Sequence, residues 1–136
     1  MSSMLGMTSV IHGGDKLGRL SHIKGIIEQA KKEYSSISVD AIEVEKNSIG
    51  IAEIRDLIEK STYTSLSARH RLFIIYDAQK LTDQAQNALL KLYEEQHKHS
   101  TYVLEVDSHQ SLLPTILSRA VLIDVSAGVL DTQLDQ

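Results

Sequence analysis

The stretch from Arg71 to Gln96 constrains the fold of this chain more than any other. It opens with the apolar run Leu72–Tyr76, which is short and rich in β-branched and aromatic residues. Strands that are buried on both faces of a parallel sheet have this composition. Asp77 follows at the carboxyl end of the run, the edge of an open α/β sheet where ligands and reacting groups collect. The stretch therefore predicts a buried parallel strand with a functional acid at its tip.

A helix is predicted directly after this acid. Thr82 is suited to cap it, and Asp83 places negative charge at the positive end of the helix dipole. One apolar face is formed at helical spacing by Ala85, Ala88, Leu89 and Leu92. A hydrophobic strand, a terminal acid and a returning helix are typical of the Walker B segment of nucleotide-binding ATPases.

Similar alternation along the rest of the chain predicts an α/β fold with a five-stranded parallel sheet and helices on both faces. Four more strands are expected, at 8–11, 40–45, 101–106 and 121–125. Further helices are expected at 21–34, 48–60 and 112–120. The 136 residues suit one domain, and a hydrophobic content of 42% is enough for a core of that size.

Composition also excludes several classes of protein. The net charge is −4 with acids and bases interspersed, which argues against a surface that grips nucleic acid throughout. The chain has no cysteine, so it has neither disulfides nor a thiolate zinc site. No apolar run approaches the roughly 20 residues of a membrane span, and the N-terminus does not resemble a signal peptide. We expect a cytoplasmic protein without a membrane partner.

A glycine-rich segment follows the first predicted strand. From Gly13 it reads G-G-D-K-L-G-R-L, against the phosphate-binding pattern G-x-x-x-x-G-K-[ST]. Gly13 and Gly18 have the required spacing, but Arg19 replaces the lysine and Leu20 replaces the hydroxyl that binds magnesium. Leucine cannot be a Mg²⁺ ligand, because that ion takes oxygen ligands. On its own, the segment is either a glycine-rich turn at a strand–helix joint or a decayed P-loop.

The residues DAQKLTDQAQNALLKLYEE, which begin at Asp77, resemble bacterial DNA polymerase III clamp-loader subunits, which are AAA+ proteins. Their pattern after the Walker B strand is acid-Ala-x-x-Leu-Thr-x-x-Ala-x-Asn-Ala-Leu-Leu-Lys-x-x-Glu-Glu. Within that family the greatest similarity is to the delta-prime subunit, and it extends from about Thr8 to Val125. The resemblance implies a three-layer, RecA-like P-loop NTPase domain over residues 8–125. It also makes the decayed P-loop the better interpretation of Gly13, Gly18 and Arg19.

The resemblance implies that this domain does not hydrolyse ATP. Active members carry Asp-Glu after the strand, and here Tyr76 stands at the first acid while Asp77 stands at the second. The lysine, the magnesium hydroxyl and the first acid are thus all replaced, and the delta-prime subunit is likewise the non-hydrolysing member. We expect weak or absent ATP and Mg²⁺ binding at Gly13, Gly18, Arg19 and Asp77. We expect no zinc, since the cysteine module of related subunits is absent, and His97 and His99 are predicted to lie in an exposed loop.

Two further positions acquire roles from the resemblance. The segment LLPTILSR ends at Arg119, and clamp-loader subunits have an arginine finger here that reaches the γ-phosphate in a neighbouring subunit. A guanidinium suits this task because it stays charged and binds phosphoryl oxygens bidentately. The alternative for Arg119 is an arginine that serves its own helix C-terminus. Asp107 and Ser108 stand either at the sensor 1 position of AAA+ proteins or in a strand-terminating turn.

The remaining expectations concern organisation and partners. Residues 1–7 are an N-terminal extension and 126–136 a tail, and no lid or collar domain is present, so the chain is either a fragment or a short relative. We expect a monomer in isolation. Expected partners are other clamp-loader subunits, namely an ATPase subunit and a delta-like subunit, with the sliding clamp and primer-template DNA reached through the complex. The alternatives are a degenerate ATP-binding switch and an interaction module on a P-loop scaffold.

Overall fold

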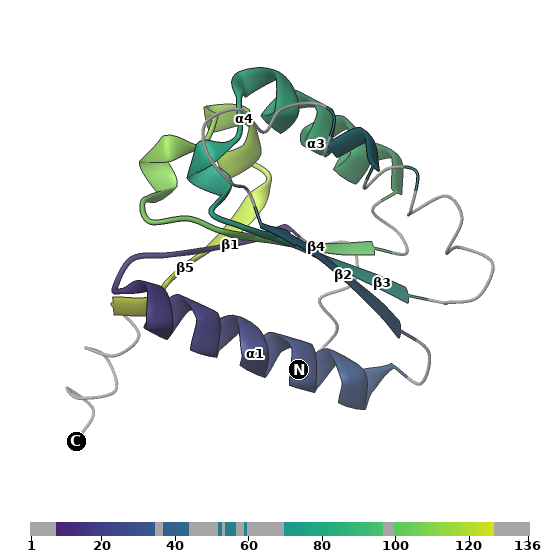
Figure 1. The fold of residues 1–136 in the computed structure, drawn as a ribbon, viewed down its shortest axis with the longest axis vertical. Helices are drawn as coiled ribbons and strands as arrows, with labels where there is room; N and C mark the ends of the chain where they lie inside the picture. The colour runs from purple at the N-terminus through teal and green to yellow at the C-terminus, as the bar shows by residue number, and fades with distance from the viewer. Residues whose placement is uncertain are drawn as a thin grey trace.

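A parallel β-sheet forms the middle layer of the domain (Figure 1). The structure, a computed structural model, describes residues 8–34, 37–43, 52, 54–56, 59, 70–96 and 100–126. The strands are β1 (Thr8–His12), β2 (Ile37–Glu43), β3 (His70–Tyr76), β4 (Ser100–Glu105) and β5 (Ala120–Asp124). They are ordered β2-β3-β4-β1-β5, and every neighbouring pair is parallel. The predicted α/β fold with a parallel sheet is confirmed.

The helices cover both faces of the sheet (Figure 1). The long helix α1 (Lys16–Glu33) lies on one face, and α3 (Asp83–Gln96) and α4 (Pro114–Leu117) lie on the other. Short 3₁₀ turns, η1 (Ala78–Lys80) and η3 (His109–Ser111), follow the ends of β3 and β4. The helix predicted at 48–60 is described only at Ala52, Ile54–Asp56 and Glu59, which are helical. The loop predicted around His97 and His99 and the tail after Ser126 lie outside the described residues.

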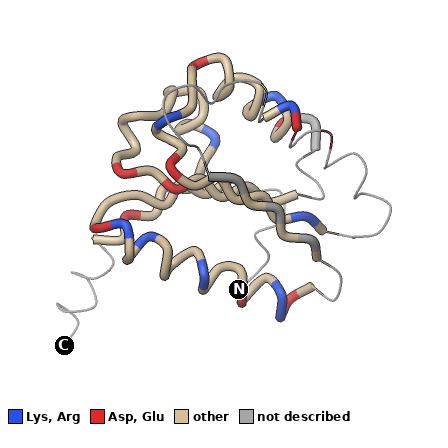
Figure 2. Tube along the Cα trace, in the orientation of Figure 1, with Lys and Arg blue, Asp and Glu red and all other residues tan. Residues whose placement is uncertain are grey.

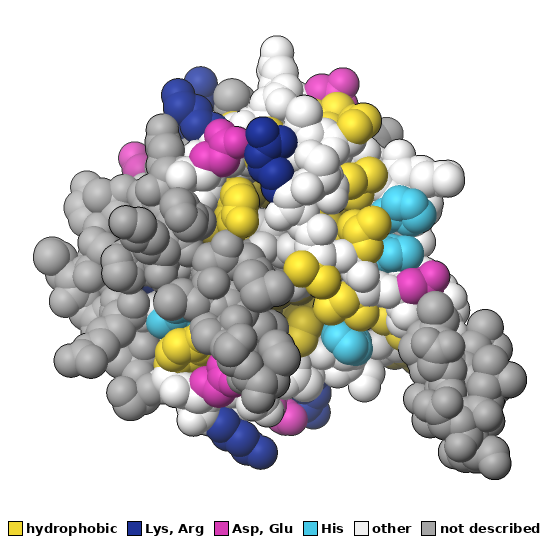
Figure 3. All heavy atoms as spheres, turned by 180° about the vertical axis from the view of Figure 1, so that it is seen from behind, with side chains coloured by type: hydrophobic (Ala, Val, Ile, Leu, Met, Phe, Trp, Pro, Cys, Tyr) yellow, Lys and Arg dark blue, Asp and Glu magenta, His cyan; other side chains and the backbone are white. Residues whose placement is uncertain are grey.

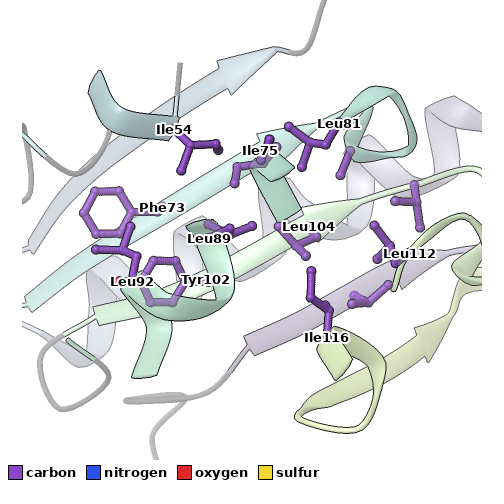
Figure 4. Packing of buried hydrophobic residues seen from close by; sticks show 14 residues of the cluster. Ile54, Phe73, Ile75, Leu81, Leu89, Leu92, Tyr102, Leu104, Leu112 and Ile116 are labelled. Carbon is purple, nitrogen blue, oxygen red and sulfur yellow. The ribbon is translucent and has the colours of Figure 1, made fainter. Parts of the chain in front are cut away.

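Alternating side chains of the central strands divide the core into two clusters. Phe73 and Ile75 of β3 point toward α3 and pack with Tyr102 and Leu104 of β4 (Figure 4). Leu72 and Ile74 point the other way and pack against α1. Strand β3 is paired with β2 on one side and with β4 on the other, and its residues from His70 to Ile75 are buried. The prediction that this strand is buried on both faces is confirmed.

Helix α3 begins as the sequence predicts. The Thr82 hydroxyl accepts a hydrogen bond from the backbone N–H of Ala85, 3.1 Å away, which satisfies one of the free donors of the first turn. The predicted apolar face packs on the sheet, with Ala85, Leu89 and Leu92 buried and Ala88 partly buried. The proline at the start of α4, Pro114, occupies the first turn, where its missing N–H costs nothing.

Helix α1 begins at Lys16, and the prediction of a start at Ser21 is wrong. Asp15 is the reason, because its carboxylate accepts a hydrogen bond from the Gly18 N–H and caps the helix. Gly18, predicted in a loop, therefore lies in the first turn of a helix. Strand β2 also begins earlier than the predicted 40–45, at Ile37, because it pairs with β3 from His70 onward.

Strand β5 forms one edge of the sheet, beside β1 only. This position explains why Val121 and Leu122, on opposite faces, are each 43% exposed. Seen from behind, the molecule shows hydrophobic side chains and histidines together at its surface (Figure 3). No helix among the described residues is long and apolar enough to cross a membrane.

Candidate nucleotide-binding edge

The carboxyl ends of β1, β3 and β4 place four charged side chains in contact. Lys16 and Arg19 come from the start of α1, Asp77 follows β3, and Glu105 ends β4. These strands are neighbours in the sheet and all run in the same direction, so their last residues meet at one edge. Figure 2 shows acidic and basic positions side by side at the start of α1. We call Lys16, Arg19, Asp77 and Glu105 the edge cluster.

The turn before α1 has a backbone that glycine permits. Gly13 has φ of 82° and Gly14 has φ of 57°, a left-handed region that other residues rarely adopt. A methyl group on Gly13 would also collide with the carboxylate of Asp124. The two glycines of the predicted P-loop spacing thus have different places: Gly13 makes the turn, and Gly18 lies within α1.

An amide N–H in the first turn of α1 is hydrogen-bonded to the carboxylate of Asp15. In a P-loop, backbone N–H groups at a helix N-terminus point at phosphate oxygens. Here the Gly18 N–H donates to Asp15 Oδ1 at 2.8 Å. An acidic side chain of the chain itself therefore accepts a hydrogen bond from the amide of this first turn.

Arg19 points inward and is fixed by three hydrogen bonds. Its Nε lies 2.6 Å from Glu105 Oε2, and its Nη1 donates to the carbonyl oxygens of Gly13 and Gly14 at 2.9 Å and 3.3 Å. The Arg19 side chain is 7% exposed and that of Glu105 is fully buried. In the P-loop alignment Arg19 stands where the phosphate-binding lysine would be, but its guanidinium is committed to the protein.

Glu105 is the centre of the edge cluster and was not predicted. Its Oε1 accepts hydrogen bonds from Lys16 Nζ at 3.1 Å and from the Asp77 backbone N–H at 2.8 Å, while Oε2 accepts from Arg19. The signal in the sequence was a lone acid within the apolar run of β4, where burial demands partners. Lys16, also unpredicted, lies between the two glycines of the P-loop pattern.

Asp77 lies where the sequence predicts, at the tip of β3. It has φ of 57° and ψ of 43°, an uncommon conformation for a residue other than glycine. Burial alone would raise the pKa of its carboxyl group, but the hydrogen bond and charge of Lys16 outweigh burial and lower the pKa. The same contact, together with Glu105, raises the pKa of Lys16 against the opposing effect of burial. Asp77 is therefore a structural ion-pair partner in this arrangement.

Tyr76 is the last residue of β3 and packs toward α1. Burial and then the charge of Glu105 raise the pKa of its hydroxyl, so it stays neutral at ordinary pH. A neutral phenol cannot replace the metal-binding carboxylate expected at this position. Among the described residues, no group of three or more His, Cys, Asp or Glu side chains could hold a metal ion.

Asp107 and Ser108 form the turn after β4. Asp107 is exposed, and its backbone N–H donates to Gln79 Oε1 at 3.3 Å. The Ser108 hydroxyl caps η3 by accepting from the Gln110 N–H. Of the two alternatives, these contacts favour the strand-terminating turn, because the residue of β4 that enters the edge cluster is Glu105.

Arg119 lies apart from the edge cluster. It precedes β5, and since the strands are parallel, the start of β5 lies with the amino ends of the strands. The edge cluster lies at the opposite, carboxyl ends. Its Nε lies 3.1 Å from Glu94 Oε2, and its Nη1 donates to the Thr115 carbonyl oxygen of its own helix at 3.0 Å. The side chains of Arg119 and Glu94 are 45% and 49% exposed. Arg119 thus caps α4 at the surface and cannot reach the edge cluster of its own chain.

Comparison with known proteins agrees with this fold. A family model described as "DNA polymerase III, delta subunit" matches residues 15–128. The chain belongs to this family. The predicted resemblance to clamp-loader subunits is therefore confirmed.

Individual relatives are similar over parts of the chain. The DNA polymerase III subunit delta' of Bacillus subtilis is 42% identical over 72 residues, which are 53% of this chain and 22% of that protein. Subunit gamma/tau of Mycobacterium tuberculosis is 34% identical over 83 residues, 60% of this chain and 14% of that one. This chain therefore spans less than a quarter of either relative.

Solved structures give the same fold. A gamma subunit-related DNA polymerase III protein of Thermotoga maritima superposes with a TM-score of 0.70 and 29% identity, over 88% of this chain and 41% of that one. The RuvB branch migration motor of the same organism gives a TM-score of 0.55 at 17% identity, over 86% of this chain and 36% of that one. The second likeness shows the fold alone, which is that of P-loop AAA+ ATPases.

Proposed function

We propose that this chain is the P-loop domain of a delta-prime-like clamp-loader subunit that serves DNA replication without hydrolysing ATP. In this role it supplies Arg119 to the active site of a neighbouring ATPase subunit. The observation that carries the proposal is the buried pair of Arg19 and Glu105, 2.6 Å apart, at the edge where active relatives would bind nucleotide. Membership of the DNA polymerase III delta subunit family supports the clamp-loader assignment.

The chemistry of the edge argues against hydrolysis. Phosphoryl transfer depends on positioned cations, a metal ion and a group that orients the attacking water. Arg19 is engaged by Glu105 and two carbonyl oxygens, Leu20 offers no oxygen ligand, and Tyr76 offers a neutral phenol. The groups that would bind ATP and Mg²⁺ are thus replaced or occupied, so binding of either is weak or absent.

The surroundings of Arg119 are compatible with action on another subunit. The side chain lies at the surface, near the amino ends of the strands, whereas the edge cluster lies at their carboxyl ends. Its pair with Glu94 is half exposed, and such pairs contribute only about 0–1 kcal/mol. The guanidinium can therefore leave Glu94 for a phosphate at small cost. The proposed partners are an ATPase subunit and a delta-like subunit, with the sliding clamp and primer-template DNA reached through the complex in the cytoplasm.

The test is to reconstitute the full-length protein with its ATPase partner and change Arg119→Ala. Arginine fingers contribute about 10³–10⁵ in turnover where they have been dissected, so turnover by the partner should fall by at least about tenfold. Binding of the partner should change much less. Arg55→Ala is the matched control, since Arg55 is also exposed on a helical segment and has no proposed role.

Two results would count against the proposal. If turnover is unchanged by Arg119→Ala while the complex still assembles, Arg119 only caps α4. If calorimetry of the single chain shows tight MgATP binding that is lost on Arg19→Ala, the protein is instead a nucleotide-binding switch.

A further inference from the structure

The carboxylate of Glu105 has an unusual set of partners for a residue in a β-strand. Three donors converge on it: an ammonium from Lys16, a guanidinium from Arg19 and the backbone N–H of Asp77, at 3.1, 2.6 and 2.8 Å. The side chain is fully buried, so all of its stabilisation comes from these groups. A lysine, an arginine and a backbone amide are also the donors by which proteins bind phosphate oxygens.

These donors also lie where a P-loop protein binds the phosphates of a nucleotide. Lys16 and Arg19 belong to the segment with P-loop spacing, and Asp77 follows the strand that carries the Walker B acids in the aligned family pattern. Oxygens of an anion at this point would meet the start of α1 and the ends of two neighbouring strands at once. In this chain the oxygens at that point belong to Glu105.

We propose that Glu105 is a built-in anion that occupies a phosphate position and holds this domain permanently in one nucleotide-independent arrangement. The inference rests on the proposed non-hydrolysing function and extends it by naming the residue that closes the site. Because Glu105 is covalently part of β4, its effective concentration at the site does not depend on any ligand, and a dissolved phosphate must displace it to enter. The domain thus keeps its P-loop fold without responding to nucleotide.

Charge balance defines which ligand the vacated site would accept. Two cations, Lys16 and Arg19, face two carboxylates, Asp77 and Glu105, so the edge cluster is neutral as a unit. Removing the Glu105 carboxylate leaves one net positive charge in a small buried space. A small oxyanion such as inorganic phosphate fits this requirement, whereas a larger polyanion exceeds both the space and the single positive charge.

The experiment compares Glu105→Ala, which opens the space, with Glu105→Gln, which removes the charge but fills the space. Thermal unfolding is measured in inorganic phosphate and in chloride of equal ionic strength. We expect phosphate to raise the Tm of the alanine variant by about 5 °C or more above its Tm in chloride. The wild-type protein, the glutamine variant and the double variant Glu105→Ala, Arg19→Ala should show no such difference.

Several outcomes would overturn the inference. One is an equal effect of phosphate on the alanine and glutamine variants, because the anion would then bind elsewhere. Another is stabilisation of the wild-type protein by phosphate that disappears on Arg19→Ala, because the site would then be open. If the alanine variant does not fold in chloride, its refolding yield in phosphate is measured, and no recovery there also rejects the inference. None of these results depends on Arg119, so the role of Glu105 and the trans role of Arg119 can fail separately.

Discussion

Glu105 Oε2 lies 2.6 Å from Arg19 Nε, and neither side chain has appreciable contact with solvent. The two residues are 86 positions apart in the chain. Their pairing joins the start of α1 to the end of β4 at the edge where a P-loop protein would hold nucleotide phosphates. The interaction therefore bears both on the stability of the domain and on the proposal that it does not hydrolyse ATP.

Arg19→Ala should destabilise the domain strongly. Without Arg19 the buried carboxylate of Glu105 keeps only Lys16 and the Asp77 N–H as donors, both on Oε1. Breaking a buried ion pair by removing one partner costs up to about 3–5 kcal/mol. Arg119→Ala is the matched control, because it removes the same side chain from a half-exposed pair worth about 0–1 kcal/mol. Urea denaturation of the two variants measures the difference in the free energy of unfolding. Equal losses would mean that the edge cluster contributes no more than a surface pair.

Gly13→Ala and Gly25→Ala should have opposite effects on stability. Alanine at Gly13 must adopt φ of 82° and meets the Asp124 carboxylate, which costs about 1–3 kcal/mol. Gly25 is exposed inside α1, and nothing lies within 4 Å of an added methyl group. Alanine there should stabilise the domain by about 0.5–1 kcal/mol, since it reduces the entropy lost when the helix forms. Thermal or urea unfolding of both variants measures the change in stability. A stabilising effect of Gly13→Ala would contradict the proposal that the turn at Gly13 requires glycine.

Stability should fall as the pH drops below about 6.5 because of His12. Burial lowers the pKa of its imidazole, and His109, whose ring centroid is 4.6 Å away, lowers the pKa further, while the charge of Asp124 opposes both. The unfolded chain then binds a proton that the folded protein does not, so protonation favours unfolding. Urea denaturation at about pH 7.5 and about pH 5.5 gives the change for the wild type.

His12→Asn should reduce this pH dependence, because it removes the buried imidazole. His22→Asn serves as the control, since His22 is exposed on α1. If the two variants keep the same pH dependence as the wild type, the effect comes from groups other than His12.

Asp77 should contribute to stability in a different pH range. Its pKa is lowered in the folded protein, since Lys16 outweighs the effect of burial, so its contribution is present above the unfolded pKa of about 3.8 and is lost as the pH falls through the folded pKa. Asp77→Asn keeps a side chain that tolerates the left-handed backbone but removes the charge. Acid unfolding followed by circular dichroism should show a weaker pH dependence below about pH 4 in this variant. An unchanged acid transition would show that the contact with Lys16 has no net effect on stability.

Local patterns in the sequence determined the elements of this fold. The apolar run at Leu72–Tyr76, the cap at Thr82 and the face of α3 depend on neighbours within a few residues, and the structure has each of them as predicted. The family membership was also readable in the segment after Asp77, which is continuous. Short-range periodicity and capping are properties of a single segment, so they can be read without the rest of the molecule.

The edge cluster was decided only by the tertiary structure. Arg19 and Asp77 were predicted as separate site residues, but Glu105 brings them together from a third element far along the chain. Sequence spacing shows that a lysine and a serine or threonine are missing from a P-loop, but it does not show which group takes the space of the phosphate. The start of α1 was misplaced partly for a local reason, because the glycine pair suggested a loop although Asp15 caps the helix from within the same segment. Only the burial of Arg19 in the first turns depends on the tertiary structure. A buried charge must find its partners in space, and those partners are fixed by the order of strands in the sheet.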